Sequence, residues 1–388
     1  MFKKGSYFHY ACANGMFYFS WGMFACIISV YLAGVGCSAT EISLVTSAGP
    51  LFAIFSQPLT GMLADKFKSP KMVAMITLVL TMISGFMFSI TKNFIFLFIF
   101  NGLTVGLLNG VNPLSDRLAT GAPYSFGSIR VWGSALYALA CQIAGIVYDL
   151  INPFANYMIF IAGMLITLWS YSNLYDVKPK GEGKAESFTI KELLSALFKN
   201  KAFVIFVLIY ILFQGPTTAN MTYMPLLIKD LGGTTSMVGT TLLLSTLFEI
   251  PAVLFSDKIL KTFSYKTLMI FAGVLSVVRF VWYSTCPPPE MIMYMFFFQG
   301  MTSIIFILVA VRIIIDVVDE RYVNSAYGIS SMLAKGVSAL VFQMISGSVL
   351  DAVKGLSGYT SIYMMYAIVM TLSVLVACTF KMPKRKFR

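Results

Sequence analysis

Five side chains that ionise lie inside long apolar stretches of the sequence: Asp116, Arg130, Glu249, Arg279 and Lys335. An ionisable group in hydrocarbon costs about 2.5–3.5 kcal/mol on insertion scales, so each of them needs a partner or a water-filled cavity. An arginine can bind hydroxyl groups or an anion, and a carboxyl group in apolar surroundings can take up and release a proton. These residues are therefore the first candidates for a substrate-binding or ion-coupling site.

Asp116 and Arg130 stand on either side of a turn around Gly121 and Ala122. Antiparallel helices joined by so short a turn meet at similar depth, so the two side chains can pair. Helical spacing places Asn101, Thr104, Asn109 and Asn112 on the face of Asp116, and Ser134, Tyr137 and Cys141 on the face of Arg130. We interpret both faces as lining a cavity. The alternatives are hydrogen bonds between packed helices and a salt bridge that only holds the two helices together.

The C-terminal half has fewer polar positions within its apolar segments. They form three groups along the chain: Gln214, Thr217 and Thr218; Gln299, Thr302 and Ser303; and Ser331, Lys335 and Ser338. Glu249, in LFEIPAVLF, is the only carboxylate well inside an apolar segment of this half. We interpret Glu249 as a proton carrier, and a fixed ion pair with Arg279 or Lys335 is the alternative.

The elements that must position these residues are membrane helices. Of 388 residues, 58% are hydrophobic and 11% are charged, against about a quarter charged in a typical soluble domain. A bilayer core of about 30 Å needs roughly 20 apolar residues of helix, and lipid offers no partner to an open backbone group. The pattern predicts twelve helices, at about 7–33, 41–63, 72–91, 94–119, 125–149, 153–173, 202–228, 234–256, 266–285, 290–315, 323–349 and 357–380.

The long hydrophilic stretch at residues 176–201 separates six predicted helices from six. The predicted fold class is therefore an all-α membrane protein with a bundle at 1–175, a central loop at 176–201 and a bundle at 202–388. Of the 28 Lys and Arg residues, 21 lie on the side of the termini and the central loop, and three lie on the other side. The positive-inside rule predicts a cytoplasmic-membrane protein with the loop and both termini in the cytoplasm.

Several function classes lack their motifs in this sequence. There is no Walker loop, no HExxH and no clustered Cys/His set, so we expect no enzyme, no cofactor and no metal site. The six cysteines have no metal-like or redox-like spacing and are interpreted as ordinary helix residues. The net charge of +12 is distributed over the loops, so it indicates orientation rather than nucleic-acid binding. The expected partners are a small-molecule solute and the lipid bilayer, with the chain as a monomer.

A short motif recurs at equivalent places in the two halves. GMLADKFKSPK joins the second and third predicted helices, and VLFSDKILKTFSYK joins the eighth and ninth. The first resembles the loop signature of the major facilitator superfamily. The matching residues are Gly61, Asp65, Lys66, Lys68 and Lys71, although Ser69-Pro70 replace the usual glycine and first basic residue. Asp257 and Lys258 form the corresponding pair in the second half. The resemblance implies two parallel six-helix halves, a gate at these residues and a binding site between the halves.

The stretch NPLSDRLATGAPYSFGSIRVWGS resembles the helix 4–5 region of the oligosaccharide/proton symporters, and of the related phenylpropionate-permease and nucleoside-symporter-like proteins. The resemblance implies that Asp116 and Arg130 bind substrate hydroxyls or a substrate charge, and that Tyr137 stacks on a sugar ring. We also assign substrate binding to Asn109, Asn112, Gln214 and Gln299. We assign ion coupling to Glu249, Arg279 and Lys335.

One departure from the sugar symporters concerns the coupling ion. Those proteins carry a Lys, His and Glu set on helix 10. The stretch MIMYMFFFQGMTSIIFILVAV has no Lys, His, Asp or Glu and places Gln299 and Thr302 near the matching positions. If the coupling ion is H⁺, with Na⁺ as the alternative, Glu249 or Asp116 must carry it.

The expected function is secondary active transport, as proton-coupled uptake of a small polar solute such as a sugar or glycoside by alternating access. Uptake of an aromatic acid or nucleoside is one alternative, with Arg130 and Arg279 binding a carboxylate. Efflux of amphiphilic compounds is another, and it predicts a more apolar cavity than the Asn and Gln positions indicate. A non-transporting membrane sensor is the least favoured.

Overall fold

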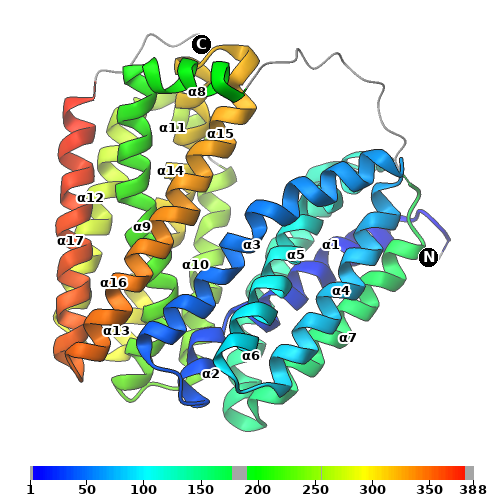
Figure 1. Cartoon of the computed structure of the whole chain (residues 1–388), viewed down its shortest axis with the longest axis horizontal. Coiled ribbons are helices and arrows are strands. Elements are labelled where there is room, and N and C mark those ends of the chain that lie inside the picture. Colours follow the sequence, from blue (N-terminus) through cyan, green and yellow to red (C-terminus); the bar gives the residue numbers. More distant parts are fainter. Residues whose placement is uncertain (1–2, 177–189, 255, 381–388) are drawn as a thin grey trace. The chain divides into compact units, whose positions relative to one another are not determined.

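The computed structural model describes residues 3–176, 190–254 and 256–380, excluding the side chains at 190, 250–254, 256, 257, 261, 320 and 324. Residues 177–189, half of the predicted central loop, and the basic C-terminal tail at 381–388 lie outside these residues. The described chain is helical throughout, which confirms the predicted fold class (Figure 1). Eleven of its helical segments are long and apolar enough to cross a membrane.

The helix bounds follow the predicted segments to within a few residues. In the N-terminal part they are α1 (Tyr7–Ala25) with α2 (Ile28–Gly34), α3 (Ala39–Lys66), α4 (Pro70–Ile90), α5 (Phe94–Thr120), α6 (Phe126–Leu150) and α7 (Pro153–Ser172). After the short α8 (Ile190–Lys199) come α9 (Lys201–Asp230), α10 (Thr235–Leu254), α11 (Ser256–Thr262), α12 (Tyr265–Ser284), α13 (Pro289–Met295) with α14 (Phe297–Val317), α15 (Val323–Ser331), a π-helical turn η2 (Met332–Val337), α16 (Ser338–Ala352) and α17 (Leu356–Thr379). Helix α10, with 20 residues, corresponds to the eighth predicted segment and completes the twelve.

The described chain divides into two compact units, residues 1–182 with 232–244, and residues 183–231 with 245–388. In the first unit α1 packs on α6 and α7, α3 packs on α5, and α4 packs on α5 and α7. The first half of α10, residues 235–244, also belongs to this unit. The Asp149 carboxylate accepts hydrogen bonds from the backbone N–H groups of Thr235 (3.1 Å) and Ser236 (2.6 Å).

The second unit repeats the packing of the first. Here α9 packs on α16 and α17, and α12 packs on α14 and α17. Gly300 brings α14 against the backbone of α10 at Ser245. When the helices are counted as membrane spans, pairs 1–5, 1–6, 3–4 and 3–6 of the first half recur as 7–11, 7–12, 9–10 and 9–12. The approach of Gly300 to Ser245 corresponds to pair 2–4. The predicted repeat therefore extends beyond the shared loop motif to the helix contacts.

Polar side chains cap the first turns of several helices. Ser38 and Glu41 form a capping box at the start of α3, because the Ser38 Oγ accepts from the Glu41 N–H and the Glu41 carboxylate accepts from the Ser38 N–H. Ser69, Asn93, Asn152, Asn200 and Ser264 each accept a backbone N–H at the start of their helices. These caps satisfy donors that a helix cannot pair internally.

The interpretation of all six cysteines as ordinary helix residues is wrong for two of them. The structure joins Cys26 and Cys141 by a disulfide, with the Cα atoms 5.6 Å apart. The pairing is hidden in the sequence because 115 residues separate the two positions. It arises because Gly22 lets α1 lie against Ala140 and the backbone of Tyr137 on α6. The other four cysteines are free thiols.

Candidate functional site

The Arg130 side chain is held by a cluster of residues from three helices of the first unit. Its guanidinium carbon lies 4.2 Å from the centre of the Tyr18 ring of α1, a cation–π contact, and its Nη1 lies 3.4 Å from the Ser134 Oγ. The Tyr18 hydroxyl donates a 2.6 Å hydrogen bond to the Asn112 Oδ1 of α5. Tyr18 therefore links the arginine of α6 to the polar face of α5.

Asp116 approaches this cluster without joining it. The carboxylate interacts electrostatically with Arg130, but no ion pair within 4.0 Å joins the two among the described residues. The Asp116 Oδ1 is buried and accepts no hydrogen bond from a described residue. The buried Asn14 of α1 likewise has no hydrogen-bond partner among the described residues for its Nδ2 or its Oδ1. Three buried polar atoms thus lack protein partners next to an arginine, as expected where a polar ligand or water binds.

Gly133 makes the close approach of these groups possible. A Cβ atom at Gly133 would lie 2.5 Å from the Asn14 Oδ1, 2.7 Å from the Tyr18 ring and 2.9 Å from the Arg130 Nη1. Any larger residue would push the three side chains apart. The glycine of the SIRVWGS stretch is therefore an essential part of the cluster.

The polar face of α5 has two functions rather than one. Asn101 donates to the Val45 carbonyl of α3 (2.6 Å) and Thr104 donates to the Ser84 hydroxyl of α4 (2.9 Å), and both are buried. These two residues form the interhelical hydrogen bonds named above as the alternative to a cavity. Asn109 donates to the Val105 carbonyl of its own helix (2.8 Å), and only Asn112 and Asp116 reach the Arg130 cluster.

The Tyr137 side chain, assigned to ring stacking by resemblance, lies on α6 beside Gly22 of α1, half-buried. Its role with a substrate stays a prediction.

A second polar group lies in the second unit, on α9 and α14. The Asn220 Nδ2 donates a 2.7 Å hydrogen bond to the Gln299 Oε1, and both residues are fully buried. The remaining Oδ1 of Asn220 and Nε2 of Gln299 have no hydrogen-bond partner among the described residues, and neither does the Oε1 of Gln214. The Gln214 Nε2 lies 3.4 Å from the Thr218 hydroxyl. One helical face of α9 and its neighbour on α14 thus offer both a donor and an acceptor to a ligand.

Glu249, Arg279 and Lys335 are not paired with one another. Among the described residues the structure shows no ion pair or hydrogen bond to any of the three side chains. The guanidinium group of Arg279 is 1% exposed and packs against Phe280, with its carbon 4.7 Å from the ring centre. Lys335 lies in the π-helical turn η2, a type of distortion that recurs at functional sites. The fixed ion pair considered for Glu249 is therefore absent here.

The loop motif is anchored by an arginine that the sequence did not single out. The Arg117 Nη1 of α5 and the Asp65 Oδ1 of α3 form a 2.9 Å salt bridge. Gly61 lies in open space and Lys66 ends α3. Lys258 lies in α11, and the side chain of its neighbour Asp257 is outside the described residues.

Sequence reasoning also missed Asn14, Tyr18 and Asn220. The signal was present on α1, where Asn14, Tyr18 and Trp21 follow the i, i+4, i+7 spacing of one helical face within an apolar segment. No group of three or more His, Cys, Asp or Glu residues in the described part of the chain could hold a metal ion.

Known proteins resemble the chain over most of its length. A maltose permease of Geobacillus stearothermophilus is 26% identical over 341 residues, which cover 87% of this chain and 86% of that permease. An uncharacterized transporter of Bacillus subtilis, YwbF, is 24% identical over 94% of this chain and 91% of its own length. A quinolone resistance protein of Staphylococcus aureus, NorA, is 25% identical over 67% of this chain and 68% of its own length.

Solved structures agree on the fold. The nucleoside transporter NupG, in a mutant form, superposes with a TM-score of 0.87 at 17% identity, covering 96% of this chain and 99% of that one. A D-xylose-proton symporter superposes with a TM-score of 0.74 at 14% identity, covering 98% and 99%. The model of the MFS_1 like family matches residues 9–363. The chain therefore belongs to the MFS_1 like family, and it is a multi-pass secondary transporter of the major facilitator superfamily rather than an enzyme.

Proposed function

We propose that the transporter takes up a small polar solute, such as a sugar or glycoside, together with protons. The observation that carries the proposal is the Arg130 cluster, in which an arginine, a tyrosine and two asparagines converge with unpaired polar atoms. Hydroxyl groups of a sugar can donate to the Asp116 carboxylate and accept from the Arg130 guanidinium. The relatedness to a maltose permease and to a sucrose permease of Escherichia coli supports this substrate class.

Within this proposal Arg130, Asp116 and Asn112 bind the solute in the first unit, and Tyr137 stacks on its ring. Gln214 and Gln299 are further proposed solute-binding residues, and Asn220 donates a hydrogen bond to the Gln299 amide oxygen. Asn109 supports the face of α5. Asp65, Lys66, Gly61 and Arg117, together with Asp257 and Lys258, form the gating motif of the transport cycle.

Glu249 is proposed as the proton carrier. A half-buried carboxyl group without an ion-pair partner is free to be neutral or charged, and a reversible carrier needs that freedom. Arg279 and Lys335 act with Glu249 by changing the local electrostatic potential during the cycle. Both cations lack ion-pair partners among the described residues, so their positive charge is uncompensated there.

A nucleoside or aromatic acid is the second candidate substrate. The likeness in fold to NupG and the relatedness to a probable 3-phenylpropionic acid transporter of Escherichia coli favour it. The two unpaired amide atoms of Asn220 and Gln299 also match the donor and acceptor edge of a nucleobase.

Transport assays in de-energised vesicles test the proposal. The vesicles contain the full chain, and an external pH electrode records alkalinisation when maltose, other sugars, nucleosides or aromatic acids are added. We expect alkalinisation with a sugar, loss of it in Arg130→Gln and Asp116→Asn, and no response to uncharged buffer solutes. Alkalinisation with nucleosides alone would select the second candidate. Sugar uptake that leaves the external pH unchanged would refute proton coupling.

The role of Glu249 is tested by the Glu249→Gln variant. Since glutamine cannot carry the proton, uphill accumulation should be lost, whereas exchange of labelled for unlabelled solute should continue. Glu290→Gln, at an exposed glutamate of α13, is the matched control and should behave as the wild type. Uphill uptake by Glu249→Gln at the wild-type level would exclude Glu249 as the carrier.

A further inference from the structure

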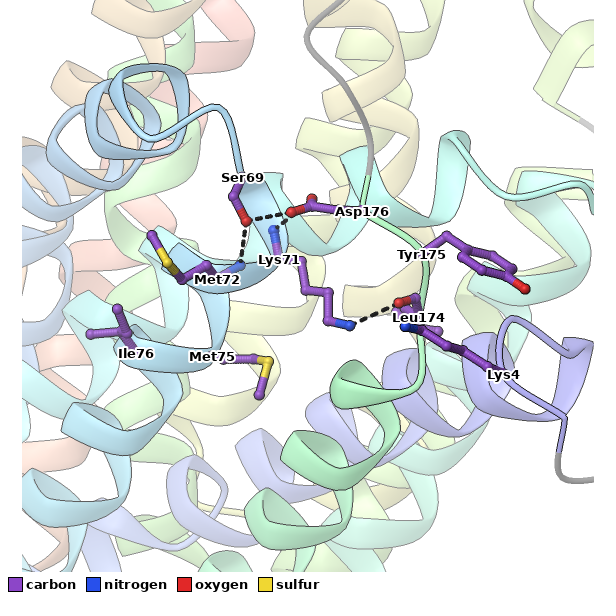
Figure 2. Close-up of a pocket in the computed structure, with 9 residues that line it drawn as sticks. All are labelled: Lys4, Ser69, Lys71, Met72, Met75, Ile76, Leu174, Tyr175 and Asp176. Carbon is purple, nitrogen blue, oxygen red and sulfur yellow. Dashed lines mark hydrogen bonds between the residues drawn. The ribbon is translucent and has the colours of Figure 1, made fainter.

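A cavity of about 460 Å³ lies in the first unit where α4 begins, apart from the Arg130 cluster. It is lined by Lys4, Ser69, Lys71, Met72, Met75, Ile76, Leu174, Tyr175 and Asp176 (Figure 2). Three chain segments meet here: the residues before α1, the first two turns of α4 and the residues after α7. Of these side chains, only Lys71 belongs to the loop motif of residues 61–71.

The Lys71 ammonium group is fixed at this cavity by the backbone. Its Nζ donates to the carbonyl oxygens of Ser172 (2.7 Å) and Leu174 (2.8 Å), as Figure 2 shows for Leu174. An ammonium group has three donors, so one N–H of Lys71 remains for another acceptor. Carbonyl oxygens do not neutralise the positive charge. The Asp176 carboxylate attracts the Lys71 ammonium group and the Lys4 ammonium group repels it.

The carboxylate in the cavity, that of Asp176, already accepts hydrogen bonds from other residues of the chain. Asp176 accepts hydrogen bonds from the Ser69 hydroxyl and from the Lys71 backbone N–H (3.2 Å), and Ser69 in turn accepts from the Met72 N–H (3.2 Å). These bonds cap the first turn of α4, so the helix terminus is already satisfied and is not the binding group.

Lys4 adds a second positive charge to the same cavity. Its Nζ lies 5.9 Å from the centre of the Tyr175 ring, and it interacts electrostatically with Lys71, charge against like charge. In Figure 2 both ammonium groups lie beside Leu174. Two lysines and one aspartate leave a net positive charge, and an anion between the two ammonium groups would relieve their repulsion.

The cavity continues into an apolar ridge along α4. Exposed side chains recur at helical spacing toward the other end of the helix, namely Met72, Ile76, Leu80, Ile83, Met87 and Ile90. These side chains are between 36% and 54% exposed, so nothing in the described chain covers them. A ridge of this kind in a membrane transporter contacts acyl chains.

We propose that this cavity binds the phosphate group of an anionic phospholipid, with one acyl chain of the lipid along the α4 ridge. The two ammonium groups supply the charge complementarity, and the ridge supplies the apolar contact that a free anion would not use. The orientation predicted from the distribution of Lys and Arg places this end of α4 at the cytoplasmic leaflet, where anionic lipids carry the surface charge.

Native mass spectrometry of the full chain tests the proposal, with detergent micelles that contain either phosphatidylglycerol or phosphatidylcholine. The wild type should retain phosphatidylglycerol in preference to phosphatidylcholine. Lys4→Gln should weaken retention of phosphatidylglycerol about fivefold, because one basic residue near an anionic lipid contributes about that factor. Apart from its repulsion with Lys71, the Lys4 side chain interacts only with Tyr175 among the described residues, so this substitution should leave the fold intact. Ile76→Gln should also weaken retention.

The matched control removes a lysine at the opposite end of the same helix. Lys92 follows α4, and Lys92→Gln makes the same change of charge without touching the cavity. Unchanged retention in Lys4→Gln, or equal losses in Lys4→Gln and Lys92→Gln, would overturn the proposal. Displacement of the lipid by millimolar inorganic phosphate, with no effect of Ile76→Gln, would overturn it in favour of a free-anion site.

Discussion

At the scale of single residues, the Arg130 cluster shows how one charge is accommodated in an apolar segment. The Arg130 guanidinium lies over the Tyr18 ring, and the Tyr18 hydroxyl donates a hydrogen bond to Asn112. The direct salt bridge with Asp116 that the short turn indicated does not form. Arg130 and Asp116 thus lie near each other without a direct ion pair. Their polar atoms can therefore bind a ligand, whereas a direct ion pair would occupy them.

Separate changes at Tyr18 can distinguish its two contacts. Tyr18→Phe keeps the ring under Arg130 and removes the hydrogen bond to Asn112, a net loss of about 1 kcal/mol, or roughly fivefold in solute affinity. Tyr18→Leu removes both contacts and should weaken solute binding at least tenfold. Isothermal titration in detergent measures both affinities. Equal affinities in the two variants would show that the ring makes no contribution.

The thiol of Cys37 gives a prediction of pH dependence outside the membrane spans. Burial, and then the neighbouring Glu41 carboxylate, raise the pKa of the Cys37 thiol above its usual value. Since the thiolate is the reactive form, maleimide labelling of Cys37 should be slow at neutral pH and should rise about tenfold per pH unit toward the raised pKa.

Stopped-flow labelling of a variant that keeps only Cys37 of the four free cysteines measures this profile. Glu41→Gln preserves the capping box and removes the negative charge, so it should shift the profile to lower pH. A wild-type profile with the midpoint of an unperturbed thiol would contradict the prediction.

At the scale of elements, glycines decide which helices approach closely enough to form the site. Helix α6 meets α1 at Gly22 and Gly133, and α5 meets α3 at Gly102 and Gly106, where the Phe52 side chain fills the space. In a membrane such contacts stabilise helix pairs through packing rather than through the hydrophobic effect. The disulfide of Cys26 and Cys141 lies at the same α1–α6 contact.

Gly133→Ala tests the importance of this approach. The added methyl would clash with Asn14, Tyr18 and Arg130, so we expect a loss of about 1–3 kcal/mol in stability and at least tenfold weaker solute binding. Gly127→Ala on the same helix is the control, because its Cβ would have only the Ser125 hydroxyl within 4 Å, at 3.9 Å. Thermal unfolding and solute titration measure both. A Gly133→Ala protein that matches Gly127→Ala would contradict the role given to this glycine in the cluster.

At the scale of the whole molecule, the second unit repeats the helix contacts of the first. The division of the chain into two six-helix bundles, expected from the recurring loop motif and the even division of the apolar segments, stays a prediction. The orientation of the chain in the membrane rests on the Lys and Arg distribution alone and stays a prediction.

Labelling of cysteines in intact cells tests this orientation. Cys286, between α12 and α13, should react with an impermeant maleimide from outside, after Cys12, Cys37 and Cys378 are replaced by serine. Lys258→Cys, in the same background with Cys286 also replaced by serine, should react only after the cells are permeabilised. The reverse pattern would show the opposite orientation.

The sequence by itself determined the helices, their number and their ends, because apolar length and polar caps are local properties that lipid enforces on any chain. It also identified polar or charged residues within apolar segments whose presence requires a partner or a function, namely Asp116, Arg130, Asn112 and Glu249. The family and fold expected from the loop motif and the helix 4–5 region are confirmed by the family match and by the superposition on NupG.

Only the tertiary structure decided which polar residues share a site. Asn101 and Asn112 look alike in sequence, yet one bonds to the α3 backbone and the other to Tyr18 of α1. Cys26 pairs with Cys141 across 115 residues, and Lys4 meets Lys71 at a cavity beside the exposed ridge of α4. The physical reason is that helical periodicity defines the face on which a side chain lies, whereas the neighbour of that face depends on packing between helices far apart in the chain.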